Sequence, residues 1–110
     1  MANGSLEYYE LFPENDLQPG NRLVINVDDL EILLLNINGE YFAVENCCTH
    51  EDEKLDPGEL EGYQIACPRH GSRFDVRTGA ALTLPAYKPV HTFPVKVENG
   101  RVFLGIPELD

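Results

Sequence analysis

Residues 46–72 read NCCTHEDEKLDPGELEGYQIACPRHGS, and two short motifs in this stretch decide how the chain is interpreted. The first is Cys48-Thr49-His50 and the second is Cys67-Pro68-Arg69-His70, with residues 51–66 between them. Each motif offers one thiolate and one imidazole from a compact loop. An isolated cysteine or histidine is more often a packing residue than a ligand, but two matched pairs argue against coincidence. The stretch therefore predicts a metal centre held by Cys48, His50, Cys67 and His70.

The order of residue types in the two motifs suits a centre with two metal ions. Two irons bridged by two sulfides need four terminal ligands, and a Cys2His2 set gives both thiolates to one iron and both imidazoles to the other. Two loops that hold such a flat cluster must each reach both metals. A tetrahedral zinc site has no such demand, and it remains the alternative, with a zinc-stabilised interaction module as its function.

These motifs resemble those of the Rieske family of [2Fe-2S] proteins. The likeness rests on Cys48-Thr49-His50, on the run from Cys67 to Ser72, and on Phe74-Asp75 and Thr78-Gly79. The surrounding sequence looks like the Rieske ferredoxins of bacterial oxygenase systems. The resemblance implies an all-β, Rieske-like fold of small antiparallel sheets, with an inserted cluster-binding subdomain at about residues 46–72. It also implies one [2Fe-2S] cluster per chain, with His50 and His70 near solvent as the route for electrons.

The rest of the chain has the turn pattern of an all-β domain. Turn dipeptides recur between segments rich in Val, Ile, Leu, Tyr and Phe, namely Pro19-Gly20, Asn38-Gly39, Pro57-Gly58, Thr78-Gly79 and Asn99-Gly100. Asn38-Gly39 and Asn99-Gly100 tolerate positive φ and predict tight hairpins. Period-two alternation predicts half-buried strands at residues 22–27 and 91–97. Pro94 should face a sheet edge or a bulge because it donates no ladder hydrogen bond. A short helical turn is expected near residues 14–18.

Length and composition favour one small domain in a reducing compartment. A chain of 110 residues, 43% of them hydrophobic, can bury one modest core, so residues 1–110 are expected to form a single domain. Three cysteines cannot all pair within the chain, and residues 1–20 lack the pattern of a signal peptide, which favours a cytoplasmic location. The longest apolar run, at residues 32–35, is far shorter than the roughly 20 residues of a membrane-spanning helix, so no membrane association is expected.

The charge balance favours protein partners over nucleic acid. Eight basic and 19 acidic residues give a formal net charge of −11 at pH 7. This charge repels phosphate backbones, so no nucleic-acid partner is expected. The same charge attracts a basic docking surface on another protein and speeds their encounter.

The resemblance implies an electron carrier and not an enzyme. Such a carrier would accept one electron from a flavin-dependent reductase and deliver it to a terminal oxygenase or another redox acceptor. A Rieske oxygenase also needs a mononuclear iron site, which would occupy a much longer chain. A small Rieske subunit of a nitrite-reductase-like complex is the second hypothesis. Many such subunits are thought to lack the ligands, whereas all four are present here.

Residues beside the motifs bear on the reduction potential. High-potential Rieske proteins carry an extra cysteine in each ligand loop and a tyrosine hydroxyl aimed at a ligand cysteine. Arg69 stands at one disulfide position here and Phe74 at the tyrosine position, which leaves Ser72 as a side-chain donor. We therefore expect a potential of about −150 mV, at the low end of the Rieske range.

Three other places in the chain lie outside the predicted ligand set. Cys47 adjoins Cys48, but adjacent side chains in an extended segment point to opposite sides, so Cys47 is not expected to be a ligand. His91 lies in a strand pattern and is given no role. Leu84-Pro85-Ala86 falls where related proteins place a proline-containing loop that shields the cluster, with an ordinary turn as the alternative.

Overall fold

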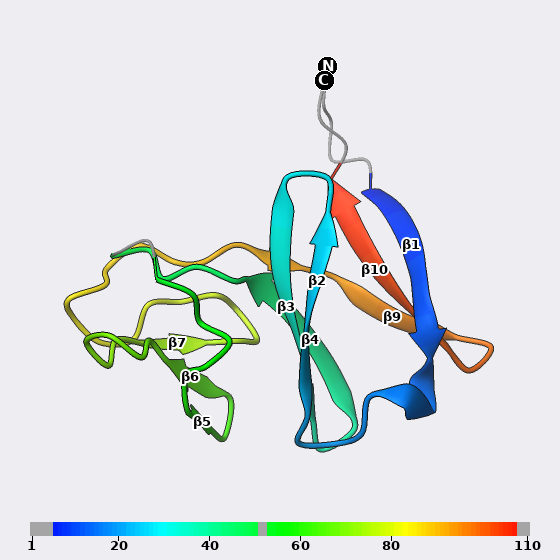
Figure 1. The fold of residues 1–110 in the computed structure, drawn as a ribbon, viewed down its shortest axis with the longest axis horizontal. Coiled ribbons are helices and arrows are strands. Elements are labelled where there is room, and N and C mark those ends of the chain that lie inside the picture. Colours follow the sequence, from blue (N-terminus) through cyan, green and yellow to red (C-terminus); the bar gives the residue numbers. More distant parts are fainter. Residues whose placement is uncertain (1–5, 51–52, 108–110) are drawn as a thin grey trace.

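The computed structural model describes residues 6–50 and 53–107, which form three small antiparallel sheets (Figure 1). The first sheet contains β1 (Leu6–Pro13), β10 (Arg101–Pro107) and β9 (Val95–Glu98), in that order. The second contains β2 (Arg22–Val27), β3 (Leu30–Ile37), β4 (Glu40–Glu45) and β8 (Thr92–Phe93). The third contains β5 (Leu60–Glu61), β6 (Gln64–Ala66) and β7 (Arg73–Asp75). The expected all-β fold of small antiparallel sheets is confirmed.

The tight turns follow the residues that tolerate a left-handed backbone. Asn38 and Gly39, with φ of 55° and 92°, join β3 to β4, and Asn99 and Gly100, with φ of 53° and 74°, join β9 to β10. Both predicted hairpins are therefore confirmed. The short 3₁₀ helix η1 (Glu14–Asp16) confirms the helical turn expected near residues 14–18.

Pro94 divides the segment that we expected to be one strand at residues 91–97. β8 ends just before it and pairs with β4 in the second sheet, whereas β9 begins just after it and pairs with β10 in the first. Pro94 donates no ladder hydrogen bond, but its carbonyl accepts one of 2.8 Å from the Gly105 amide. The chain therefore crosses from one sheet to another at the residue that cannot continue a ladder.

β3 is buried on both faces and joins two cores. Leu33 and Leu35 pack into a core shared with the third sheet, and Ile32 and Leu34 pack into a core shared with β10. The first of these cores also contains Phe74, which is fully buried. Full burial of such side chains stabilises the fold by roughly 1.5–3 kcal/mol each. The third sheet, on the left in Figure 1, is thus held against the second sheet by apolar contacts.

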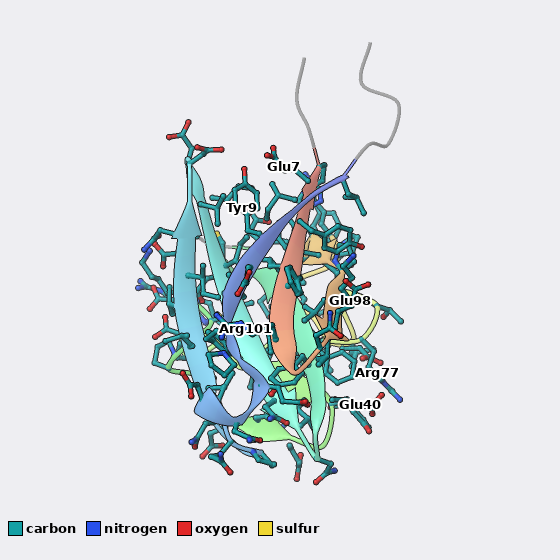
Figure 2. The ribbon with its side chains drawn as sticks, turned by 90° about the vertical axis from the view of Figure 1, so that its right-hand side faces the viewer. Glu7, Tyr9, Glu40, Arg77, Glu98 and Arg101 are labelled. Carbon is teal, nitrogen blue, oxygen red and sulfur yellow. The ribbon has the colours of Figure 1, made fainter. Side chains whose placement is uncertain are left out.

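Charged side chains lie among exposed apolar ones on the side of the molecule away from the third sheet. Figure 2 views the face of β1 and β10, where Glu7, Glu98 and Arg101 lie. The Arg101 Nε donates to the Glu10 Oε2 at 2.6 Å across these two strands. Within residues 6–50 and 53–107, no helix is long and apolar enough to cross a membrane.

Candidate metal centre

The two cysteines of the predicted site are buried beside the third sheet. Cys48 lies three residues after the end of β4, and Cys67 directly follows β6. Each is 2% exposed, and both belong to the core that contains Ile65 and Phe74. Two sequence segments that are far apart therefore bring their thiols into the same apolar environment.

The two histidines of the site lie at the surface and close to each other. His50 and His70 are exposed, their ring centres are 6.0 Å apart, and their ring planes meet at 70°. The structure thus brings together one imidazole from each motif, as the pattern of the sequence requires.

The separation of the two rings can be tested against metal coordination. An imidazole nitrogen binds a metal such as zinc at about 2.0–2.1 Å, and its ring centre lies about 1.1 Å further back, so two rings on one tetrahedral ion have centres about 5.2 Å apart. The observed 6.0 Å differs from this value by less than 1 Å. Small rotations of the exposed His50 and His70 side chains cover that difference, so the ring positions fit a shared ion.

Within the described part of the chain, no group of three or more His, Cys, Asp and Glu side chains is placed to hold a single metal ion. A two-iron cluster takes only two protein ligands on each iron, so it requires no such group. The donor set suits this division, because the soft thiolates are buried together and the imidazoles lie together at the surface.

Backbone hydrogen bonds shape each ligand loop. The Cys48 amide donates to the Glu53 carbonyl at 2.7 Å, and the Cys67 amide donates to the Ser72 carbonyl at 2.7 Å. The Gly71 amide donates to the Cys67 carbonyl at 2.9 Å, with Gly71 at a φ of 78° that glycine adopts without strain. Each cysteine therefore begins a turn that returns to it after five residues.

A third segment, residues 82–90, is bonded to both ligand loops. The Thr49 Oγ1 donates to the Lys88 carbonyl at 2.7 Å, and the Ala86 amide donates to the Ser72 Oγ at 3.1 Å. In the same segment Leu84 and Tyr87 remain 79% and 74% exposed. These contacts place the segment that contains Leu84-Pro85-Ala86 beside the two loops, which agrees with its expected position, while its shielding role stays a prediction.

Four residues singled out in the sequence lie outside the predicted ligand set. Ser72 and Phe74 are both buried. The Ser72 hydroxyl oxygen accepts a hydrogen bond from a backbone amide, and its own hydrogen can be donated to a sulfur atom. The Cys47 Sγ lies 3.5 Å from the Cys48 carbonyl oxygen, and the Cys47 side chain is half-buried. His91 is exposed.

Charged residues also link the ligand loops to each other and to β3. The Arg69 Nη1 lies 3.9 Å from the Glu53 Oε1, across the two loops. The Lys54 ammonium donates to both carboxylate oxygens of Glu31 at 2.7 Å. The hydrogen bond from Lys54, and then one from the Asn46 amide, hold the pKa of the Glu31 carboxyl below its usual range.

Three residues that shape the site did not stand out in the sequence. Asn46 bonds across the base of the first loop to Leu55, Thr49 bonds to residues 82–90, and Gly58 packs against the backbone before Cys67. Each acts through a partner that is distant in the sequence. The sequence marked only Gly58 among them, as part of the turn dipeptide Pro57-Gly58.

Comparison with known proteins gives the same picture of fold and chemistry. The family model described as "Rieske [2Fe-2S] domain" matches residues 7–94. The ferredoxin component of a naphthalene 1,2-dioxygenase system from Pseudomonas putida is 38% identical over 102 residues, which are 93% of this chain and 98% of the relative.

Two solved structures have the same fold. The ferredoxin of carbazole 1,9a-dioxygenase from Nocardioides aromaticivorans IC177 superposes with a TM-score of 0.83 at 32% identity, covering 92% of this chain and 98% of that one. A chain in a complex of reduced oxygenase and oxidized ferredoxin in carbazole 1,9a-dioxygenase superposes with a TM-score of 0.84 at 30% identity, covering 94% and 97%.

Proposed function

The chain belongs to the Rieske [2Fe-2S] domain family, and from this premise we propose that Cys48, His50, Cys67 and His70 are the ligands of its cluster. The protein carries one [2Fe-2S] cluster and is an electron carrier, like the ferredoxin components that it resembles. One observation supports the ligand set above all others. Two buried thiols and two neighbouring imidazoles come from separate loops, one of each from each loop.

When bound, the cluster supplies one-electron redox chemistry at a potential set by its ligands and their surroundings. Cys48 and Cys67 hold their sulfur atoms in an apolar core, away from water. His50 and His70 lie at the surface and offer the shorter path for an electron to leave or enter. We infer that a partner docks on the histidine side.

We further propose that residues 46–72, with β7 completing their sheet, act as the cluster-binding subdomain of a single domain that spans residues 1–110. The apolar core shared by β3 and the third sheet supports this assignment, because it makes the subdomain depend on the second sheet. β7, at Arg73–Asp75, extends the subdomain slightly beyond the stretch marked by the motifs.

The partner we propose is the terminal oxygenase of a dioxygenase system, with a flavin-dependent reductase as the electron donor. The relatives' names support the oxygenase, since one is a component of a naphthalene dioxygenase system and another is seen in complex with its oxygenase. The exposed Leu84 and Tyr87, next to the ligand loops, offer apolar area to a partner. We place the protein in the cytoplasm because its odd number of cysteines suits a reducing compartment.

The family assignment sets aside the zinc-stabilised module considered from the sequence. A subunit of a nitrite-reductase-like complex is likewise not favoured, because the matched relatives are named as ferredoxin components of dioxygenase systems.

The ligand set is tested by substitution with matched controls in the same chain. Visible absorption, iron and acid-labile sulfide content, and low-temperature electron paramagnetic resonance before and after dithionite are measured on each variant. We expect Cys48→Ser and His70→Ala to lose the native spectrum. Cys47→Ser and His91→Ala replace a cysteine and a histidine outside the proposed ligand set, and both variants should keep it. A native spectrum in Cys48→Ser, or its loss in Cys47→Ser, would contradict the ligand set.

The proposed partner is tested by electron transfer between purified proteins. The dithionite-reduced protein is mixed with an oxidised Rieske oxygenase of a dioxygenase system, and the reoxidation rate is followed by absorbance. We expect the rate to fall in Leu84→Ala and Tyr87→Ala, with the potential unchanged. Exposed Val97, on the distant β9, serves as the control. Equal slowing by Val97→Ala would contradict docking on the histidine side.

A further inference from the structure

Asn46 is a buried polar residue whose side chain bonds to four partners. It is 3% exposed and stands two positions before Cys48. Its Oδ1 accepts from the Leu55 amide at 2.9 Å and from the Asp56 amide at 2.8 Å. Its Nδ2 donates to the Glu31 Oε2 at 2.8 Å and to the Asp56 Oδ1 at 3.0 Å. The carboxamide thus uses both of its acceptor positions and both of its donors.

These bonds connect the two ends of the first ligand loop. Asn46 precedes the Cys48-Thr49-His50 motif, while Leu55 and Asp56 follow it, so one side chain spans the loop at its base. Leu55 is fully buried in the core beside the third sheet, which fixes one end of that span. The Asn46 backbone amide also donates to the Glu31 carbonyl at 2.9 Å, which fixes the other end to β3.

Only an amide satisfies all four partners. Two of them are backbone N–H groups that need an acceptor, and two are carboxylates that need a donor. An aspartate in place of Asn46 would keep the acceptor, but it would set a third carboxylate against Glu31 and Asp56. An alanine would remove the side-chain acceptor of the buried Leu55 amide and of the part-buried Asp56 amide.

We propose that Asn46 is a positioning residue for the cluster, because its side chain holds the first ligand loop in the shape that presents Cys48 and His50. The inference rests on the proposed ligand set. Asn46 does not touch the reacting atoms in this role. Its side chain joins the two ends of the first ligand loop. Its hydrogen bond to Glu31, whose charge is balanced by Lys54, connects these ends to β3.

The chain provides a matched control in Asn36. This residue is also an asparagine at 3% exposure, and its side chain also bonds to the backbone, donating to the Leu17 carbonyl at 2.7 Å and accepting from the Gly39 amide at 2.9 Å. It lies in β3 near the hairpin at Asn38-Gly39 and bonds to neither ligand loop. Loss of Asn36 therefore reports the general cost of removing a buried amide.

The experiment compares the holoprotein with Asn46→Ala and Asn36→Ala. Transfer of iron to a chelator, the reduction potential, the paramagnetic resonance spectrum and the thermal midpoint are measured for each. We expect Asn46→Ala to release iron at least about tenfold faster, equivalent to about 1.4 kcal/mol, and to shift the potential and the spectrum. Asn36→Ala should lower the thermal midpoint while iron release stays within about twofold. Equal acceleration in the two variants would overturn the positioning role.

A second pair of variants covers the case in which Asn46→Ala does not fold. Asn46→Asp should release iron quickly, and adding Asp56→Asn should slow it again, because residue 56 then donates to residue 46. Failure of Asp56→Asn to slow the release would refute the inference. Cys48→Ser in the same series separates the two proposals. If Cys48→Ser retains its iron, the ligand set is overturned. If Cys48→Ser loses its iron while the Asn46 variants release iron at the rate of the unsubstituted protein, only the role of Asn46 is overturned.

Discussion

Substitution of Gly58 by alanine should separate the two ligand loops. Gly58 lies in the first loop region, and an added Cβ would stand 1.9 Å from the Ala66 carbonyl oxygen, immediately before Cys67. Real Cβ atoms stay beyond 3.0 Å from such neighbours, so the two backbones must part by about 1.1 Å. All three nearest atoms, two of the Ala66 carbonyl group and the Leu55 carbonyl oxygen, belong to the backbone, so no side-chain rotation can relieve the contact. Functional constellations tolerate displacements of about 0.5 Å, and this one is twice as large.

Overpacking of this kind typically lowers the free energy of unfolding by about 1–3 kcal/mol. The larger effect should be on the amount of cluster that the protein holds. We expect Gly58→Ala to be purified with clearly less than the full complement of iron and sulfide. Gly62→Ala is the control. Gly62 lies in the turn between β5 and β6 of the third sheet, and no atom lies within 4 Å of its added Cβ. Its φ of 61° costs alanine roughly 1–2 kcal/mol, so both variants lose stability.

Iron content, sulfide content and visible absorption per chain are measured beside the thermal midpoint for both glycine variants. We expect Gly58→Ala to lose cluster and Gly62→Ala to keep it at a comparable loss of stability. A Gly58→Ala protein with full iron content and an unchanged spectrum would refute the argument that this close approach sets the distance between the loops.

Two further predictions concern acid stability and the reduction potential. The hydrogen bond from Arg77 lowers the pKa of the Asp75 carboxyl. This pair therefore stabilises the fold fully at pH values above the ordinary aspartate pKa of about 3.9. The stabilisation is lost as the pH falls through the lowered pKa. Arg77→Met should therefore flatten the acid fall in thermal midpoint, and an unchanged acid profile would contradict this. Ser72→Ala removes a donor worth about 1 kcal/mol and should lower the potential by roughly 40 mV in film voltammetry; an unchanged or higher value would speak against sulfur as its acceptor.

Local patterns in the sequence were sufficient for much of the fold. Asn38-Gly39 and Asn99-Gly100 adopt the positive φ values that their side chains tolerate, and both predicted hairpins exist. The turn at Asp28 and Asp29, between β2 and β3, was missed because aspartate enters the left-handed region less often than the Asn-Gly pair.

Features that depend on distant partners were not accessible from the sequence. β1 was missed because it is specified by pairing with β10, almost the whole chain away. The period-two pattern at residues 91–97 was correct for strand, but the change of sheet at Pro94 depends on the separate partners β4 and β10.

The site shows the same division between local and distant signals. The motif residues could be named from their spacing, because ligand chemistry restricts the residue types. The residues that support the ligand loops, which include Asn46, Thr49 and Gly58, act through hydrogen bonds and close contacts to residues as far away in the sequence as Lys88. Sequence spacing carries no record of those contacts, so they emerged only from the structure.

The central claim is that two loops supply sulfur donors to one iron and ring nitrogens to the other. It is tested most directly by pulsed electron–nuclear double resonance on the reduced protein, prepared with ¹⁵N-labelled histidine. The account predicts couplings from two histidine nitrogens, retained in His91→Ala and altered in His50→Ala and His70→Ala. A reduced cluster with no coupled histidine nitrogen would contradict the account.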